Sequence, residues 1–184
     1  MNSDPALRQR TIVLVGLMGA GKSSVGRRLA HALGLPFRDA DEEVERAAGR
    51  SVAEIFEDLG ETAFRDGERR VIARLLEDPP HVLATGGGAF MNPETRQLIA
   101  DKAISIWLRA DIEVLARRVS RKNDRPLLRG RDAKAVLAEL ARDRHPIYAL
   151  ADLTVESAES PHHNTVHAAI EALTAHLRPE VPPS

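Results

Sequence analysis

Residues 16–23, GLMGAGKS, are the part of the sequence whose residue types and spacing point most directly to chemistry. They match the pattern G-x-x-x-x-G-K-[ST] at every fixed position. Glycines let backbone N–H groups turn towards phosphate oxygens, and a helix that begins there presents its positive end to them. In such a loop Lys22 reaches the β- and γ-phosphates, and the Ser23 hydroxyl coordinates Mg²⁺. The segment predicts a nucleoside-triphosphate site but does not name the acceptor of the phosphoryl group.

Two carboxylates, Asp39 and Asp41, follow the next apolar segment and are two residues apart. Extended residues at i and i+2 point the same way, so we expect both to face the ligand edge of a sheet. One of them would help to hold Mg²⁺, and the other would orient an acceptor hydroxyl or take its proton. The alternative is that Asp41 is a helix N-cap, with Glu42 and Glu43 in the first turn.

Three consecutive glycines, residues 86–88, end another apolar segment. They either let a ligand or a second backbone approach closely, or form a plain tight turn. Arg65, Arg125 and Arg144 are far apart in the chain, and periodicity alone does not bring them together. Arg125 lies in a basic segment, where it is either a mobile arginine that closes over phosphates or a solvated charge. Arg65 and Arg144 are likewise either ligand contacts or solvated arginines.

The elements that must position these residues alternate between strands and helices. Apolar, β-branched runs predict strands at residues 11–16, 35–41, 81–88, 103–110 and 152–157. Helices are predicted at residues 23–34 (with Gly34 as the stop), 41–77 (with breaks near 49–51 and 60), 93–101, 111–120, 132–149 and 162–177. This alternation predicts an α/β fold with three α/β/α layers and a five-stranded parallel sheet. His162 and His163 open the last helix and are expected on the surface.

The chain has 184 residues, 43% of them hydrophobic, and no cysteine. One domain over residues 1–184 is therefore expected, with frayed tails at 1–10 and 178–184 and a mobile lid at about 121–132. The absence of cysteine excludes disulfides and thiolate chemistry and fits a reducing cytosol. The formal net charge of −1 argues against nucleic-acid binding, and no apolar run is long enough to cross a membrane.

These motifs, in this order, resemble the shikimate kinases, which belong to the nucleoside-monophosphate-kinase-like group of P-loop kinases. The resemblance covers residues 11–157 and includes D-x-D, G-E-x-x-F-R, G-G-G and R-P-L-L, a combination far more specific than the phosphate loop alone. It is carried by GLMGAGKSSVG (16–26), FRDAD (37–41), SVAEIFEDLGETAFRDGE (51–68), ATGGGAF (84–90), DRPLL (124–128) and RHPIYALAD (144–152).

The resemblance implies ATP-dependent phosphorylation of the 3-hydroxyl of shikimate, in aromatic amino-acid biosynthesis. It implies shikimate and ATP as substrates, one Mg²⁺ ion held by Ser23 and Asp39, and a cytoplasmic monomer. The implied catalytic residues are Lys22, Asp41 and Arg125. The residues implied at ATP are Gly19, Ala20, Gly21, Lys22, Ser23, Ser24, Arg118 and Arg125, with Arg117 as the alternative to Arg118 near adenine. The residues implied at shikimate are Asp41, Phe56, Phe64, Arg65, Gly86, Gly87, Gly88 and Arg144.

Two other hypotheses stay open on the sequence. One is another small-molecule P-loop kinase, acting on gluconate or a nucleotide. A nucleotide acceptor would need a base-binding site, whereas two arginines with Asp41 suit a small polyhydroxylated acid better. The other is a non-catalytic regulator that binds shikimate or a nucleotide. Such a protein is expected to have lost Lys22, Asp41 or a clamp arginine, and none is missing.

Overall fold

The computed structural model describes residues 5–121, 130–159 and 161–178. Most of the predicted lid, including Arg125, lies outside the described residues. The described strands are β1 (Thr11–Val15), β2 (Phe37–Asp39), β3 (Val82–Ala84), β4 (Ala103–Arg109) and β5 (Leu153–Glu156). The helices are α1 (Lys22–Leu33), α2 (Ala40–Ala48), α3 (Val52–Leu75), α4 (Pro93–Lys102), α5 (Ile112–Ser120), α6 (Ala133–Tyr148) and α7 (His162–Leu177). Two 3-10 helices, η1 (Pro5–Arg8) and η2 (Ala89–Met91), complete the described elements.

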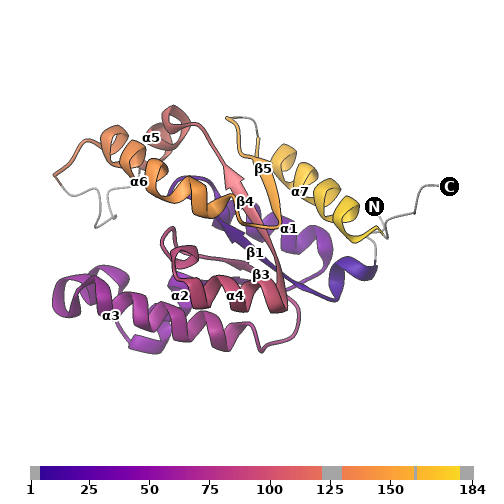
Figure 1. Ribbon diagram of the computed structural model, residues 1–184, viewed down its shortest axis with the longest axis horizontal. Helices are drawn as coiled ribbons and strands as arrows, with labels where there is room; N and C mark the ends of the chain where they lie inside the picture. The colour runs from indigo at the N-terminus through magenta and orange to yellow at the C-terminus, as the bar shows by residue number, and fades with distance from the viewer. Residues whose placement is uncertain (1–4, 122–129, 160, 179–184) are drawn as a thin grey trace.

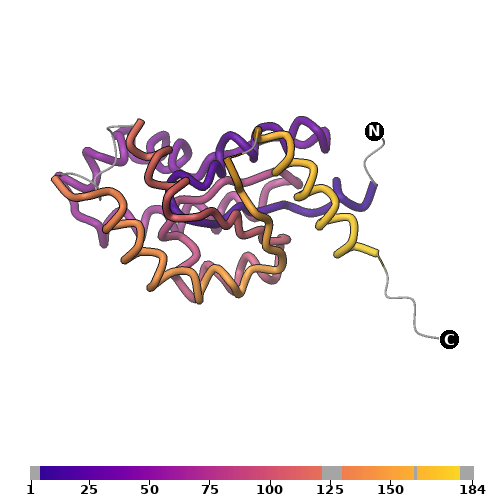
Figure 2. The backbone as a smooth tube through the Cα atoms, turned by 90° about the horizontal axis from the view of Figure 1, so that it is seen from above, coloured from indigo at the N-terminus to yellow at the C-terminus, as the bar shows by residue number. Residues whose placement is uncertain are grey.

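The five strands form one parallel sheet, as the alternation of elements predicts, and their order in it is β2-β3-β1-β4-β5 (Figure 1). The central strand β1 is buried along its whole length, which explains its continuous apolar run. Helices cover both faces of the sheet, and Figure 2 shows α6 and α7 on opposite sides of it. The loops after β1, β2 and β3 therefore meet at one carboxyl edge.

The second strand is shorter than the sequence predicts, because it ends at Asp39 and Asp41 lies in the first turn of α2. Asp39 caps this helix: its side chain accepts from the N–H of Asp41 at 3.0 Å and from that of Glu42 at 3.4 Å. The cap is thus Asp39 rather than Asp41, and strand periodicity does not orient the two carboxylates. The predicted break near residue 60 is present, since Gly60 has φ 84° and ψ 170° inside α3.

The sequence predicted a frayed tail over residues 1–10, but the structure has a 3-10 helix, η1, within that range. Leu7, in this 3-10 helix, is only 2% exposed and belongs to the hydrophobic core. The segment packs against α7, so its apolar side chain is covered from the far end of the chain. No helix in the described part of the chain is both long and apolar enough to span a membrane.

We expect Leu7→Ala to lower the free energy of unfolding by about 2–4 kcal/mol, because the substitution leaves a cavity in a packed core. Urea denaturation followed by circular dichroism measures this loss. Leu59→Ala is the matched control, since Leu59 is 59% exposed and its truncation should cost less than about 0.5 kcal/mol. Equal effects of the two substitutions would show that η1 does not contribute to the core.

Candidate active site

The phosphate loop joins β1 to α1 and is held by its own backbone. Gly16, Gly19 and Gly21 all have positive φ, at 145°, 83° and 90°. A Cβ on Gly16 would lie 2.7 Å from the carbonyl oxygen of Leu108, so this position also excludes a side chain on steric grounds. The Nζ of Lys22 donates to the carbonyl oxygens of Gly16 at 2.7 Å and Leu17 at 2.9 Å. The loop is therefore folded into a compact turn that these backbone conformations and hydrogen bonds hold.

Ser23 and Asp39 come together beside this loop. The Ser23 hydroxyl donates to Oδ2 of Asp39 at 2.6 Å, while Oδ1 of Asp39 caps α2. A hydroxyl and a carboxylate are the hard oxygen ligands that Mg²⁺ prefers, and this ion usually keeps waters and phosphate oxygens as its other ligands. The described residues contain no group of three or more acidic or imidazole side chains that could hold a metal. The pair thus fits a Mg²⁺ ion that is shared with a nucleotide.

Two cavities open at the carboxyl edge of the sheet. The phosphate-loop cavity, about 450 Å³, is lined by Met18, Gly19, Gly21, Lys22, Ser23, Ser24, Asp39, Asp41, Thr85, Gly86, Gly87, Arg118, Arg121 and His162. The second, which we call the arginine cavity, is about 430 Å³ and is lined by Met18, Asp39, Asp41, Glu42, Glu45, Ser51, Val52, Ala53, Phe56, Phe64, Arg65, Glu68, Gly86, Gly87, Gly88 and Arg144. They share the five residues Met18, Asp39, Asp41, Gly86 and Gly87. A group bound in one cavity would therefore face a group bound in the other across these residues.

The three glycines after β3 form the floor of the arginine cavity. A Cβ on Gly88 would lie 2.4 Å from Cζ of Arg65, and one on Gly87 would lie 3.1 Å from Nη1 of Arg144. Arg65 comes from α3 and Arg144 from α6, so two cations from distant parts of the chain reach the same backbone segment. This arrangement can bind a small acid through charge-assisted hydrogen bonds.

Arg65 is held by two carboxylates of its own helix. Its guanidinium donates to Oε1 of Glu68 at 3.0 Å and to Oε1 of Glu61 at 3.3 Å. Glu68 is only 2% exposed, and burial raises the pKa of its carboxyl while the charge of Arg65 opposes that shift. Oε2 of Glu68 has no hydrogen-bond partner within the described part of the chain. The apolar side of the cavity is formed by Phe64, whose ring centroid is 4.9 Å from that of Phe56.

Asp41 lies where the two cavities meet. Its burial raises the pKa of its carboxyl, the negative charge of Asp39 adds to this shift, and the charges of Lys22 and Arg65 oppose it. A carboxylate with a raised pKa is a stronger base than an ordinary aspartate. Its position suits it to bind a hydroxyl in the arginine cavity that faces the phosphate loop.

Arg118 rather than Arg117 faces the phosphate-loop cavity. Its guanidinium donates to the carbonyl oxygen of Gly19 at 3.1 Å and to the Ser157 hydroxyl at 3.1 Å. Arg117 is instead paired with Glu159 at 2.8 Å, and both of these side chains are exposed. The loop after β5 is also tied to the phosphate loop, since Ser157 donates to the carbonyl oxygen of Ala20 at 2.8 Å.

The structure brings most of the predicted site residues to these two cavities. All eight residues predicted at shikimate line the arginine cavity, and the predicted ATP residues Gly19, Gly21, Lys22, Ser23, Ser24 and Arg118 line the phosphate-loop cavity. Ala20, within the loop, is buried and does not line the cavity. Arg125 lies outside the described residues. The role of each residue stays a prediction.

Some residues of the site were missed or misplaced from the sequence. Glu68 could have been found, because it is three residues after Arg65 on a predicted helix. His162 was expected on the surface, but it lines the phosphate-loop cavity and its Nδ1 is buried without a partner in the described chain. No local signal marks His162, since the course of the chain after β5 places it beside Gly21.

Comparisons with known proteins agree with this geometry. The family model described as Shikimate kinase matches residues 18–174. A curated shikimate kinase of Caulobacter vibrioides is 70% identical over 167 residues, which cover 91% of this chain and 84% of that protein. A curated shikimate kinase of Bradyrhizobium diazoefficiens is 58% identical over 172 residues, which cover 94% of this chain and 83% of that protein. A solved shikimate kinase of Acinetobacter baumannii, in complex with shikimate, has a TM-score of 0.90 at 34% identity and covers 95% of this chain and 98% of that one. A loop built for phosphates, a neighbouring cavity with two arginines, and these sequence matches together place the chain in the shikimate kinase family.

Proposed function

We propose that this protein transfers the γ-phosphoryl group of ATP to the 3-hydroxyl of shikimate, a step of aromatic amino-acid biosynthesis. The observation that carries the proposal is the convergence of Arg65 and Arg144 on a cavity that shares Asp41 with the phosphate-loop cavity. The two arginines would bind the carboxylate of shikimate, and Asp41 would bind its hydroxyl groups. This arrangement directs one hydroxyl of the acid towards the terminal phosphate of ATP.

The phosphate loop and its lysine would do most of the work on the donor side. Phosphoryl transfer is catalysed mainly by positioning and by stabilising charge, so Lys22 and the loop N–H groups would neutralise the transferring phosphate. Arg125, in the predicted lid, is proposed to approach the same phosphates. Asp41 would orient the acceptor hydroxyl or accept its proton, as its raised pKa allows.

Ser23 and Asp39 are proposed to hold Mg²⁺ together with the phosphates of ATP. When bound, this ion supplies positive charge that offsets the negative charge of the β- and γ-phosphates. Ser23 and Asp39 lie within hydrogen-bond distance of each other, so the fold places the two oxygen ligands side by side. The monomeric state and cytoplasmic location stay predictions.

We expect ADP to form only when shikimate is supplied. Purified protein is incubated with MgATP and shikimate, gluconate, nucleoside monophosphates or no acceptor, and ADP release is measured.

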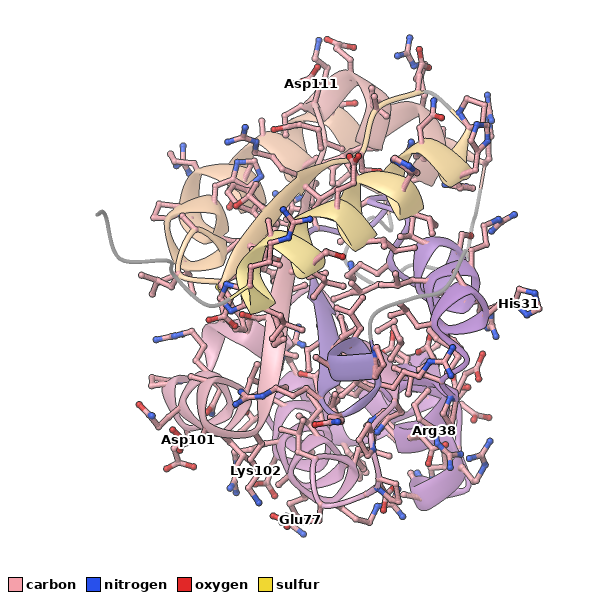
Figure 3. The ribbon with its side chains drawn as sticks, turned by 90° about the vertical axis from the view of Figure 1, so that its right-hand side faces the viewer. His31, Arg38, Glu77, Asp101, Lys102 and Asp111 are labelled. Carbon is pink, nitrogen blue, oxygen red and sulfur yellow. The ribbon has the colours of Figure 1, made fainter. Side chains whose placement is uncertain are left out.

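Lys22→Ala should reduce turnover by about 10²–10³-fold, because the loop loses its charged donor. Lys102→Ala is the control, since Lys102 pairs with Glu77 on the surface (Figure 3). Equal rates with gluconate, or full activity of Lys22→Ala, would contradict the proposal.

Arg144→Ala and Arg65→Ala should each raise the KM for shikimate by about 10- to 100-fold and change the KM for ATP by less than threefold. The reason is that each substitution removes charge-assisted hydrogen bonds to the carboxylate, worth about 1.5–3 kcal/mol. Initial-rate kinetics with each substrate varied in turn separate the two KM values. Arg69→Ala is the control on α3, since Arg69 pairs with Asp66 and Glu94 outside both cavities. Parallel rises in both KM values would show that the arginines do not form a carboxylate clamp.

Asp41→Asn should reduce kcat by about 100-fold or more and at the same time raise Tm at pH 7. A raised pKa means that the ionised carboxylate is less favourable in the folded chain than in the unfolded chain. Its cost is present above the unfolded pKa of about 4 and absent below it, so the gain in Tm should shrink as the pH falls towards 4. Thermal unfolding at several pH values measures this difference. Asp101→Asn, at an exposed position, is the control (Figure 3), and a lower Tm for Asp41→Asn at pH 7 would be inconsistent with the burial argument.

A further inference from the structure

The single tyrosine of the chain, Tyr148, is a buried polar residue that the proposed mechanism does not use. It is the last residue of α6 and has 0% exposure. Its hydroxyl donates to the carbonyl oxygen of Gly87, in the floor of the arginine cavity. Tyr148 does not itself line that cavity, so it supports the floor from the side away from a ligand.

Arg144 reaches the same glycine as this hydroxyl, since its Nη1 would lie 3.1 Å from a Cβ on Gly87. Residues 144 and 148 are four apart on α6, so their side chains leave the same face of the helix. Burial raises the pKa of Tyr148 to about 12, while the charge of Arg144 and a side-chain hydrogen bond with it act in the opposite direction. The hydroxyl is therefore neutral at physiological pH and remains a hydrogen-bond donor to Gly87.

This contact matters because the segment that it holds has little stiffness of its own. Glycine samples more backbone conformations than any other residue, and three occur here in succession. The peptide bonds are trans throughout the described chain, so a carbonyl and the N–H that follows it point in opposite directions. With its carbonyl bound to Tyr148, Gly87 turns the N–H of Gly88 away from Tyr148. The N–H groups of Gly87 and Gly88 donate no hydrogen bond within the described residues.

We propose that Tyr148 is a positioning residue for the acidic substrate, whose hydroxyl fixes the glycine floor and the Arg144 guanidinium in the arrangement that binds a carboxylate. This inference rests on the proposed function, because it assigns Tyr148 a part in shikimate binding. Tyr148 touches neither substrate, so its effect is transmitted through Gly87 and Arg144.

Tyr148→Phe tests the inference, because it removes one oxygen atom and keeps the buried ring. We expect the KM for shikimate to rise about 5- to 10-fold, while kcat and the KM for ATP change by less than twofold. Removing the donor leaves the Gly87 carbonyl unpaired and Arg144 without its neighbour, and both changes affect only the arginine cavity.

Ser105→Ala is the matched control for a merely structural hydroxyl. Ser105 is buried on β4, its hydroxyl exchanges hydrogen bonds with Asp152 at 2.8 and 2.9 Å, and it lines neither cavity. Both variants should lose a few degrees of Tm, but only Tyr148→Phe should change the KM for shikimate. A Tyr148→Phe enzyme that loses Tm and keeps the wild-type KM would overturn the inference.

A double-mutant cycle with Arg144→Ala tests whether Tyr148 acts through that arginine. In the Arg144→Ala background, Tyr148→Phe should raise the KM for shikimate by less than it does in the wild-type background, since only its contact with Gly87 remains to be lost. An undiminished 5- to 10-fold effect there would contradict the role assigned to Tyr148.

Assays of the wild-type enzyme distinguish a failure of this inference from a failure of the proposed function. If it forms no ADP with shikimate, the proposed function fails, and shikimate binding is then followed by the fluorescence of Trp107. This is the only tryptophan, and its ring centroid is 5.9 Å from that of Tyr148. Binding that weakens 5- to 10-fold in Tyr148→Phe supports the inference on its own, and binding that is unchanged, or absent from the wild type, overturns it.

Discussion

The arrangement of the site depends on the absence of side chains at the three positions that follow β3. A Cβ at Gly88 would lie 2.4 Å from the guanidinium carbon of Arg65, and one at Gly86 would lie 2.7 Å from Oε2 of Glu68. Because β3 is next to the central strand β1, this glycine segment also borders the phosphate loop. Charged side chains from α3 and α6 can therefore approach the backbone beside a triphosphate site. A methyl group at any of these positions would require one of those side chains to move.

The cost of this arrangement is electrostatic. Asp41 and Glu68 are carboxyls whose pKa values burial raises, so the folded chain favours their ionised forms less than water does. Arg65 and Arg144 offset part of that cost, and both lie close enough to affect Glu68. The ion pairs with Glu61 and Glu68 also restrict the guanidinium of Arg65. Such preorganisation reduces the entropy lost on binding, at the expense of stability in the free enzyme.

Local sequence signals predicted the elements better than the contacts between them. The phosphate loop, the five strands and the breaks in the long helical region follow from glycine, apolar runs and periodicity. The sequence predicted that β2 ends at Asp41, but the strand ends at Asp39. The two cases look alike in the sequence, because an aspartate can be either the last residue of a strand or the N-cap of a helix, and Asp39 is the N-cap of α2. Leu7 and His162 carry no local signal, since each is covered by an element distant in the sequence. The convergence of Arg65 and Arg144 depends on the strand order. The resemblance to the shikimate kinases implied that these two arginines converge, whereas helical periodicity alone could not predict it.

Asp39 shows how the fold itself connects the two cavities. One carboxylate oxygen accepts the N–H groups that begin α2, and the other accepts the hydroxyl of Ser23 at the start of α1. One carboxylate therefore links the N-terminus of α2 to a side chain in the first turn of α1. Because the next residues of α2 include Asp41, the cap at Asp39, whose other oxygen is proposed to bind Mg²⁺, also sets the position of the group proposed to receive the acceptor hydroxyl. Any shift of α2 would displace both groups together, so the relative placement of donor and acceptor sites is fixed by a helix cap rather than by a flexible loop.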